Sequence, residues 1–158
     1  MPNPFTTFPT ILKYISKVWA LPLRFYYTKE RLDPYLILDV PSSGDPVDYY
    51  YTSQEANCGL NAYNLSPFDY TIDRIKVDVV LDGGGCFSCT NTTPYLVQGS
   101  SHHRIFVRSK CPMTPDVANR SKESKRATVN IEASIITSIR TFTIRRHIDY
   151  LKNVRVMA

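Results

Sequence analysis

The amino-acid sequence predicts an all-β protein: an antiparallel two-sheet β-sandwich, immunoglobulin-like or jelly-roll, with an N-terminal amphipathic helix. Residues 128–135 alternate between polar and apolar side chains. The apolar members are Val129, Ile131, Ala133 and Ile135. Because successive side chains of a strand point to opposite faces, this alternation is typical of a strand with one face in a core. Residues 75–81 repeat the pattern and run into a glycine-rich turn at residues 82–85.

Composition agrees with this fold class. The chain has 158 residues, a length that suits one domain with a substantial core. A hydrophobic share of 43% indicates a globular chain and not a disordered one. Tyr, Thr, Val and Ile are plentiful while Ala and Glu are scarce, which favours strands over helices. We expect an N-terminal arm of residues 1–31 followed by a β-sandwich domain of residues 32–158.

The N-terminal arm carries the one helical pattern. Its apolar residues recur at helical spacing, at Phe8, Ile11, Leu12, Ile15, Val18 and Trp19. Lys13 and Lys17 fall on the opposite side, so the segment predicts an amphipathic helix over about residues 9–21, ended by Pro22. We expect the apolar side to dock on a membrane surface, on the protein's own sandwich or on a partner subunit.

The pattern of the same arm does not indicate a transmembrane span or a signal peptide. A spanning helix needs roughly 20 mostly apolar residues, and Lys13 and Lys17 interrupt the one candidate window. Pro2, Pro4 and Pro9 precede the apolar run, which is a poor match to a signal peptide. The expected location is therefore intracellular or virion-associated in preference to secreted.

From Pro34 onward the chain reads as short strands joined by turns. A polar loop from about Pro112 to Lys125 separates the last three from the others. The expected strands are residues 35–40, 47–52 as a short edge strand, 59–64, 70–81, 95–97, 104–108, 127–136, 139–146 and about 150–156. Strands at this spacing, with no helix between them, predict a sandwich.

Charge is divided along the chain. Residues 1–31 hold five Lys and Arg against one acid, residues 32–101 hold two against nine, and residues 102–158 hold twelve against four. The favoured interpretation is internal complementarity, in which acidic and basic strands face each other. The alternative is a basic face for a phosphate-bearing partner.

A candidate nucleic-acid surface lies in the last strands. Basic residues there interleave with aromatic and β-branched ones, as phosphate contact and base stacking require. These residues are Arg140, Arg145, Arg146, Lys152 and Arg155. The same positions are also ordinary outward-facing sites on strands, and we favour that interpretation.

Four cysteines and a histidine pair suggest a metal site. Cys86 and Cys89 form a C-x-x-C pair, and a zinc ion could recruit Cys111 with either His102 or Cys58. A second C-x-x-C knuckle is missing, so no cofactor is required by the pattern. The alternatives are a disulfide pair and, in a reducing compartment, free core thiols, which we favour.

The tyrosine run Tyr49, Tyr50 and Tyr51 is a candidate protein interface, since tyrosine combines a large apolar face with a polar tip. Three successive residues of a strand place at least one outward. The sequence contains no G-x-S-x-G, H-E-x-x-H, P-loop or strand-linked G-x-G-x-x-G motif, so we expect a protein that is not an enzyme and has no small-molecule substrate.

Taken together, the sequence predicts a non-enzymatic interaction or structural module, docked on a membrane surface or a partner subunit through the amphipathic helix. The first alternative is a jelly-roll coat or shell subunit with a basic surface facing nucleic acid. The second is a zinc-stabilised nucleic-acid-binding domain.

Overall fold

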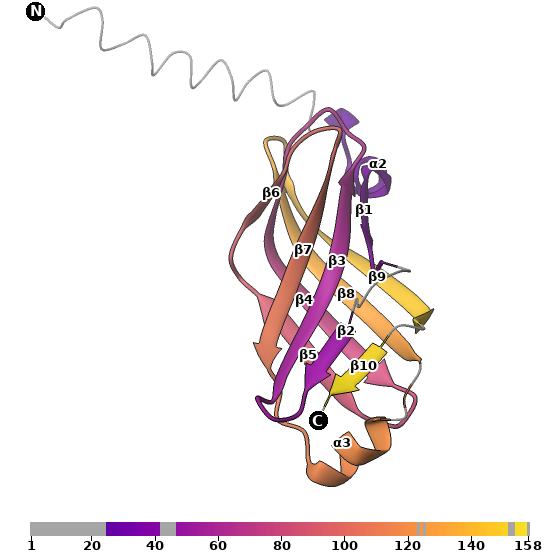
Figure 1. Cartoon of the computed structure of the whole chain (residues 1–158). Helices are drawn as coiled ribbons and strands as arrows, with labels where there is room; N and C mark the ends of the chain where they lie inside the picture. The colour runs from indigo at the N-terminus through magenta and orange to yellow at the C-terminus, as the bar shows by residue number, and fades with distance from the viewer. Residues whose placement is uncertain (1–24, 42–46, 123, 125, 152–153, 158) are drawn as a thin grey trace, which may run out of the picture.

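The computed structural model describes residues 25–41, 47–122, 124, 126–151 and 154–157. Two sheets pack face to face around one core (Figure 1). The helices are α2 (Lys29–Leu32), the 3-10 helix η2 (Asp33–Tyr35) and α3 (Pro115–Ser121). The strands are β1 (Leu36–Asp39), β2 (Val47–Tyr50), β3 (Glu55–Asn64), β4 (Tyr70–Leu81), β5 (Cys86–Asn91), β6 (Tyr95–Val97), β7 (Ser101–Lys110), β8 (Ala127–Thr137), β9 (Thr141–Leu151) and β10 (Val154–Met157).

The first sheet, called sheet A, is centred on β3. Its order is β1-β3-β2-β10, with β7 on the other side of β3. β7 pairs with β3 along its whole length, from Glu55 opposite Lys110 to Asn64 opposite Ser101. The second sheet, sheet B, has the order β5-β4-β8-β9, with β6 beside β4.

One pairing departs from the antiparallel expectation. β10 runs parallel to β2, with Val154 opposite Val47 and Met157 opposite Tyr50. The chain leaves sheet B at the end of β9 and joins sheet A instead of folding back in a hairpin, so β10 approaches β2 in the same direction. The expectation that residues 47–52 form an edge strand is wrong for the same reason, because β2 lies between β3 and β10.

The core is built as the alternation predicts. The four apolar residues of residues 129–135 are all buried, and on the paired strand β4 so are Ile75, Val77 and Val79. Each Val or Ile side chain buried in this way stabilises the fold by about 1.5–3 kcal/mol relative to an exposed position. The intervening positions are half-buried or exposed, so sheet B has one dry face and one wet face.

Two elements differ from the sequence-based expectation. The segment expected to be a loop contains α3, which begins after Thr114 with Pro115 in its first turn and buries Ala118 and Ser121. The segment carrying the C-x-x-C pair forms β5, a strand with few large apolar residues. α3 is too short for a helical period to appear among its polar neighbours.

The glycine-rich turn explains how α3 reaches the sandwich. A Cβ added at Gly83 would lie 2.6 Å from the carbonyl oxygen of Arg120 in α3, so a larger residue would push the helix away. Gly84 has a φ of 85°, a left-handed conformation that favours glycine. The backbone N–H of Gly83 donates to Ser124 Oγ at 2.9 Å. The turn therefore joins β4 and β5 and also seats α3.

The N-terminal helix expected over residues 9–21 lies outside the described residues. Within the part of the chain that the structure describes, no helix is long and apolar enough to cross a membrane.

Candidate interaction surface

The segment that leads into α2 and the loop between β3 and β4 lie at one end of the sandwich (Figure 1), and both carry exposed large apolar side chains. Phe25 is 82% exposed, Tyr26 61%, Leu65 58% and Tyr35 46%. We call these four residues the aromatic end. Single exposed apolar residues are ordinary on a protein surface, but a cluster drawn from two separate segments indicates a contact site.

Ring contacts connect the two segments of the aromatic end. The Tyr26 and Tyr27 rings meet edge to face at 5.0 Å, and Tyr27 meets Phe68 in the same way at 5.1 Å. The backbone N–H of Leu65 donates to the carbonyl oxygen of Tyr35 at 2.8 Å. Residues 25–27 are thus packed against the loop between β3 and β4.

A buried asparagine holds that loop in place. Asn64 Nδ2 lies within hydrogen-bonding distance of the carbonyl oxygens of Phe68, Val97 and Gln98, at 2.6, 3.1 and 3.0 Å. Its Oδ1 accepts from the backbone N–H and the hydroxyl of Ser66, at 3.0 and 2.8 Å. Because Asn64 is fully buried, these bonds form away from water and fix where Leu65 and Phe68 stand.

An ion pair fixes the other segment. Arg146 Nη2 donates to Asp33 Oδ1 at 2.6 Å and to the carbonyl oxygen of Leu36 at 3.2 Å. This pair joins η2 to β9 and holds the start of the described chain against sheet B. Leu32, at the end of α2, is buried beneath it.

Cations accompany the aromatic end. The Arg31 guanidinium lies 4.5 Å from the centre of the Tyr26 ring and donates to the Tyr26 carbonyl oxygen at 3.1 Å. Lys29 is exposed on the same short helix. Glu30 is the acid of this helix, and hydrogen bonds from its own backbone N–H and from Thr28 hold the pKa of its carboxyl below the usual value.

The five residues of the predicted nucleic-acid surface are not brought onto one face. Arg145 pairs with Glu132 at 2.9 Å on the outer face of sheet B, and Arg146 is held by Asp33. Arg155 pairs with Asp48 at 3.1 Å in sheet A. Arg140 is half-buried at the turn before β9, and Lys152 lies outside the described residues.

Two of these ion pairs support internal complementarity. Asp33 and Asp48 belong to the acidic stretch 32–101, while Arg146 and Arg155 belong to the basic stretch 102–158. The acidic and basic parts of the sequence therefore meet inside the folded molecule. Charge along the sequence does not translate into a basic face at the C-terminal strands.

Of the predicted zinc ligands, Cys58 and Cys111 lie near Cys89, and Cys86 and His102 are separated from them. Cys89 and Cys58 are buried, and the Cys111 thiol lies near Cys89, where it donates to the Ser88 carbonyl oxygen at 2.9 Å. Cys86 is exposed, three residues away along β5 and therefore on the opposite face. His102 lies at the far end of β7. Among the described residues, no group of three or more His, Cys, Asp or Glu could hold a metal ion.

Burial makes two of these thiols poor nucleophiles. It raises the pKa of Cys58 to about 12 and raises the pKa of Cys89 as well. Both are therefore neutral core side chains at physiological pH, as the free-thiol interpretation predicts.

The tyrosine run divides between core and surface. Tyr49 is fully buried, its hydroxyl donates to the Cys111 carbonyl oxygen at 2.8 Å, and its ring lies 5.7 Å from that of Phe87. Tyr50 is 39% exposed, and Tyr51 is half-buried just after β2. Tyr49 is thus a core residue and not an interface residue, which corrects the prediction for that position.

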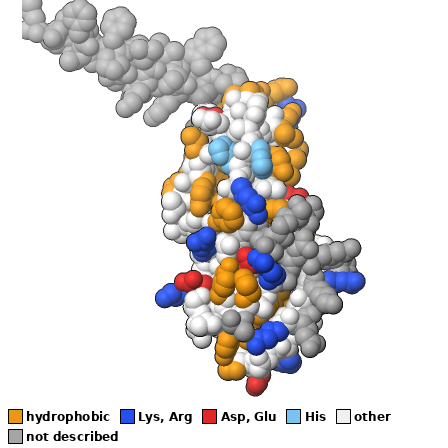
Figure 2. Space-filling model, in the orientation of Figure 1, with side chains coloured by type: hydrophobic (Ala, Val, Ile, Leu, Met, Phe, Trp, Pro, Cys, Tyr) orange, Lys and Arg blue, Asp and Glu red, His pale blue; other side chains and the backbone are white. Residues whose placement is uncertain are grey.

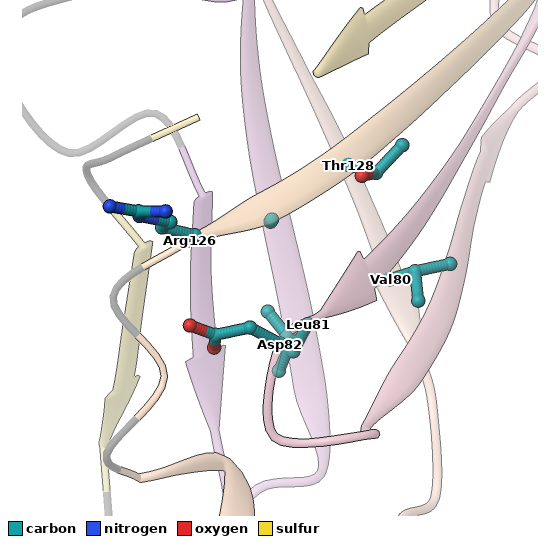
Figure 3. A pocket seen from close by; sticks show the side chains of 6 residues that line it. Val80, Leu81, Asp82, Arg126 and Thr128 are labelled. Atoms are coloured by element: carbon teal, nitrogen blue, oxygen red, sulfur yellow. The ribbon is translucent and has the colours of Figure 1, made fainter. Parts of the chain in front are cut away.

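A hollow of about 340 Å³ lies at the end of sheet B that is remote from the aromatic end, where β4 ends and β8 begins (Figure 3). Its lining residues are Val80, Leu81, Asp82, Arg126, Ala127 and Thr128. The Asp82 backbone N–H donates to the Arg126 carbonyl oxygen at 3.2 Å, which ties the two sides together. Among the described residues, the lining brings together one carboxylate, one guanidinium and one hydroxyl.

No family model matches this chain, and no curated protein matches it. Among solved structures, the structural-genomics target SoR45 is similar over 77% of this chain and 89% of its own, with a TM-score of 0.51 and 8% identity. A putative late embryogenesis abundant protein covers 92% of this chain and 89% of its own, with a TM-score of 0.42 and 15% identity. The ligand-binding region of serine-glutamate repeat protein A of Enterococcus faecium covers 78% and 97%, with a TM-score of 0.39 and 11% identity. At such identities the likeness to SoR45 concerns the fold alone.

Proposed function

We propose that this chain is a non-enzymatic interaction module, a β-sandwich that docks on a membrane surface through its aromatic end. The observation that carries the proposal is the joint exposure of Phe25, Tyr26, Tyr35 and Leu65 at one end of the molecule. Tyrosine and other aromatic side chains favour the headgroup level of a bilayer, where one part of the ring is dry and the other wet. Lys29 and Arg31 add attraction to anionic lipid.

The N-terminal arm extends the same docking surface in this proposal. The amphipathic pattern of residues 9–21 ends four residues before Phe25. Its apolar residues, of which Trp19 is the nearest to Phe25 in the sequence, would insert into the same membrane surface, and Lys13 and Lys17 would face the anionic headgroups. No helix among the described residues is long and apolar enough to span a bilayer, and Lys13 and Lys17 interrupt the apolar pattern of the arm, so we propose attachment to the surface.

The sandwich itself is proposed to be immunoglobulin-like and not a jelly roll. Immunoglobulin sheets contain three pairs of strands that are neighbours both in the sheet and in the sequence. Among the described strands, three pairs that follow each other in the sequence are also neighbours in a sheet: β2 with β3, β4 with β5, and β8 with β9. This hairpin-rich topology supports the immunoglobulin-like arrangement.

Vesicle flotation tests the docking proposal. We expect the full chain to float with vesicles containing a third phosphatidylserine and to stay at the bottom with purely zwitterionic vesicles at moderate salt. Phe25→Ser should reduce flotation strongly, while Val80→Ser, at an exposed apolar position of β4, should not. If the protein never floats, and mass photometry shows discrete oligomers that Phe25→Ser dissociates, the aromatic end binds a second copy and the membrane proposal is wrong.

A further inference from the structure

The outward side chains of β7 form a basic and aromatic row. They are His102, Arg104, Phe106, Arg108 and Lys110, and we call them the β7 stripe. The alternate residues Ile105 and Val107 are buried, so the register of the row is fixed by the core. Side chains two residues apart on one face stand roughly 6.7 Å apart, which sets a regular spacing along the strand.

The neighbouring strand β3 leaves this row uncovered and contributes one acid to it, while on the other side of β3 Asp39 of β1 lies opposite Asn61 and Asp48 of β2 lies opposite Asn57. Its outward residues are Glu55, Asn57, Gly59, Asn61 and Tyr63. Of the ten outward positions on β3 and β7, Glu55 is the one acid, and it lies at the end, opposite Lys110. Figure 2 shows this face, with histidine, hydrophobic and Lys or Arg side chains side by side and a few Asp or Glu side chains among them.

Gly59, at the centre of the face, has no side chain that would stand between Arg104 and Phe106 and the strand. A Cβ at Gly59 would lie 3.5 Å from Phe106 Cε1 and 3.6 Å from Arg104 Nη2, so both side chains reach across the glycine. The Arg104 guanidinium lies 5.2 Å from the centre of the Phe106 ring. Phe106 is nevertheless 43% exposed, which leaves aromatic surface for a ligand.

A second aromatic pair stands further along the face. The rings of Tyr63 and His102 are directly opposite each other in the β3–β7 register and stack at 4.4 Å with an angle of 16° between their planes. His102 Nε2 lies 3.5 Å from Asn61 Oδ1. The pair is therefore held in one orientation before any ligand binds, which lowers the entropic cost of stacking on it.

Arg104 and Arg108 of the β7 stripe differ from three arginines near the C-terminus of the chain. Arg145, Arg146 and Arg155 are each paired with a carboxylate. Within the described residues, no carboxylate lies within ion-pair distance of Arg104 or Arg108, and Arg108 Nε donates only weakly to the Asn57 amide oxygen, at 3.4 Å. Their charge is available to a phosphate-bearing ligand.

We propose that the β7 stripe and the outward residues of β3 bind single-stranded nucleic acid, independently of the membrane docking proposed above. A single strand offers phosphates to a line of cations and unpaired bases to aromatic faces, and the β7 stripe interleaves both kinds of group. An open sheet face exposes these groups directly, whereas reading a duplex needs an element that enters a groove. Asn57 and Asn61 supply amides for base edges.

A hollow at the lower end of the same face extends the site. It has a volume of about 290 Å³ and is lined by Tyr50, Ser53, Glu55, Ala56, Asn57 and Arg108. Tyr50, a predicted interface residue, thus contributes an exposed ring next to Arg108.

Fluorescence anisotropy on the full chain tests the proposal with three probes of matched length: a 12-mer of deoxythymidine, an abasic 12-mer with the same backbone charge, and a 12-base-pair duplex. We expect the deoxythymidine 12-mer to bind at least fivefold more tightly than either other probe, because base stacking adds to phosphate contact. Binding to it should weaken as salt rises from 50 to 200 mM.

Matched variants locate the site. Phe106→Leu keeps an apolar side chain and should weaken the deoxythymidine 12-mer about fivefold or more while leaving the abasic probe unchanged. Arg108→Gln should weaken both, and Arg145→Gln on sheet B should weaken neither. The proposal is overturned if the abasic probe binds as tightly as the deoxythymidine 12-mer, if a poly-glutamate peptide competes equally well, or if Arg145→Gln has the larger effect.

Discussion

Arg146 on β9 and Asp33 in η2 are joined through both carboxylate oxygens, at 2.6 Å to Oδ1 and 3.4 Å to Oδ2. The two residues are 113 positions apart in the sequence. Both side chains are only about a third exposed or less, at 27% and 31%, so solvent screens the pair less than a surface ion pair. This contact positions the segment on which the aromatic end is built.

Breaking this pair should destabilise the protein. Asp33→Asn removes the charge but keeps the shape, and we expect the free energy of unfolding to fall by about 1.5–3 kcal/mol, because Arg146 loses a charged hydrogen-bond partner. Glu132→Gln breaks the exposed Arg145 pair and should cost less than about 1 kcal/mol. Urea titrations of both variants make the comparison, and equal losses would contradict a special role for the Asp33 pair.

The Asn64 side chain should be required for the loop at the aromatic end. Asn64→Ala removes all of its hydrogen bonds and leaves the Val97 carbonyl oxygen without that partner, so we expect a loss of about 2–4 kcal/mol in unfolding free energy. Asn61→Ala, at a half-exposed position on the same strand, should cost less than about 0.5 kcal/mol. Chemical denaturation measures both, and an Asn64→Ala variant as stable as Asn61→Ala would show that the loop is held by other contacts.

The four thiols should react in order of exposure. Cys86 is exposed and should react with a disulfide reagent such as dithiobis-nitrobenzoate in the fast phase, followed by half-buried Cys111. Cys58 and Cys89 should react only when the protein unfolds. Cys86→Ser should remove the fast phase and Cys111→Ser should leave it intact. A fast phase that persists in Cys86→Ser would mean that β5 does not place that thiol on the surface.

Stability should fall in alkaline solution. The pKa of Cys58 is raised by burial from 9.0 to about 12, so between these pH values the unfolded chain releases a proton that the folded protein keeps. Stability is thus fully present below pH 9 and is lost as pH rises, by up to about 1.4 kcal/mol per pH unit for this group. Cys58→Ala should show a correspondingly shallower decline in urea titrations from pH 9 to 10.5. Identical slopes in the two proteins would contradict this assignment.

Much of the fold was predictable because β-strands with one wet face leave a two-residue period in the sequence. β4 occupies residues 70–81 and β8 begins at residue 127, as the alternation indicates. The alternation does not predict which strands become neighbours. For this reason the sequence predicts neither the position of β2 inside sheet A nor the parallel pairing of β10 with β2. β5 was missed because its inward residues, Phe87 and Cys89, offered too short a pattern.

The candidate sites were harder to predict because each depends on partners that are distant in the sequence. A row of C-terminal arginines reads as one basic surface until Asp33 and Asp48 are found beside two of them. The basic and aromatic residues of the β7 stripe alternate with other residues over 102–110, but the sequence pattern predicts only the strand 104–108 within this range. Recognising the stripe as a site also requires knowing that β3 lies beside it. On β3, Gly59 lets Arg104 and Phe106 lie across the strand, and Tyr63 adds a second aromatic ring.

The central claim, that the aromatic end docks on membranes, is tested most directly by partition constants onto phosphatidylserine-containing vesicles, read from the emission of the single tryptophan, Trp19. The account predicts that Phe25→Ser/Tyr26→Ser lowers the partition constant at least tenfold, because two exposed aromatic rings no longer leave water on binding. Val80→Ser should match the unaltered protein. Equal partition constants for the double variant and the Val80→Ser control would contradict the claim.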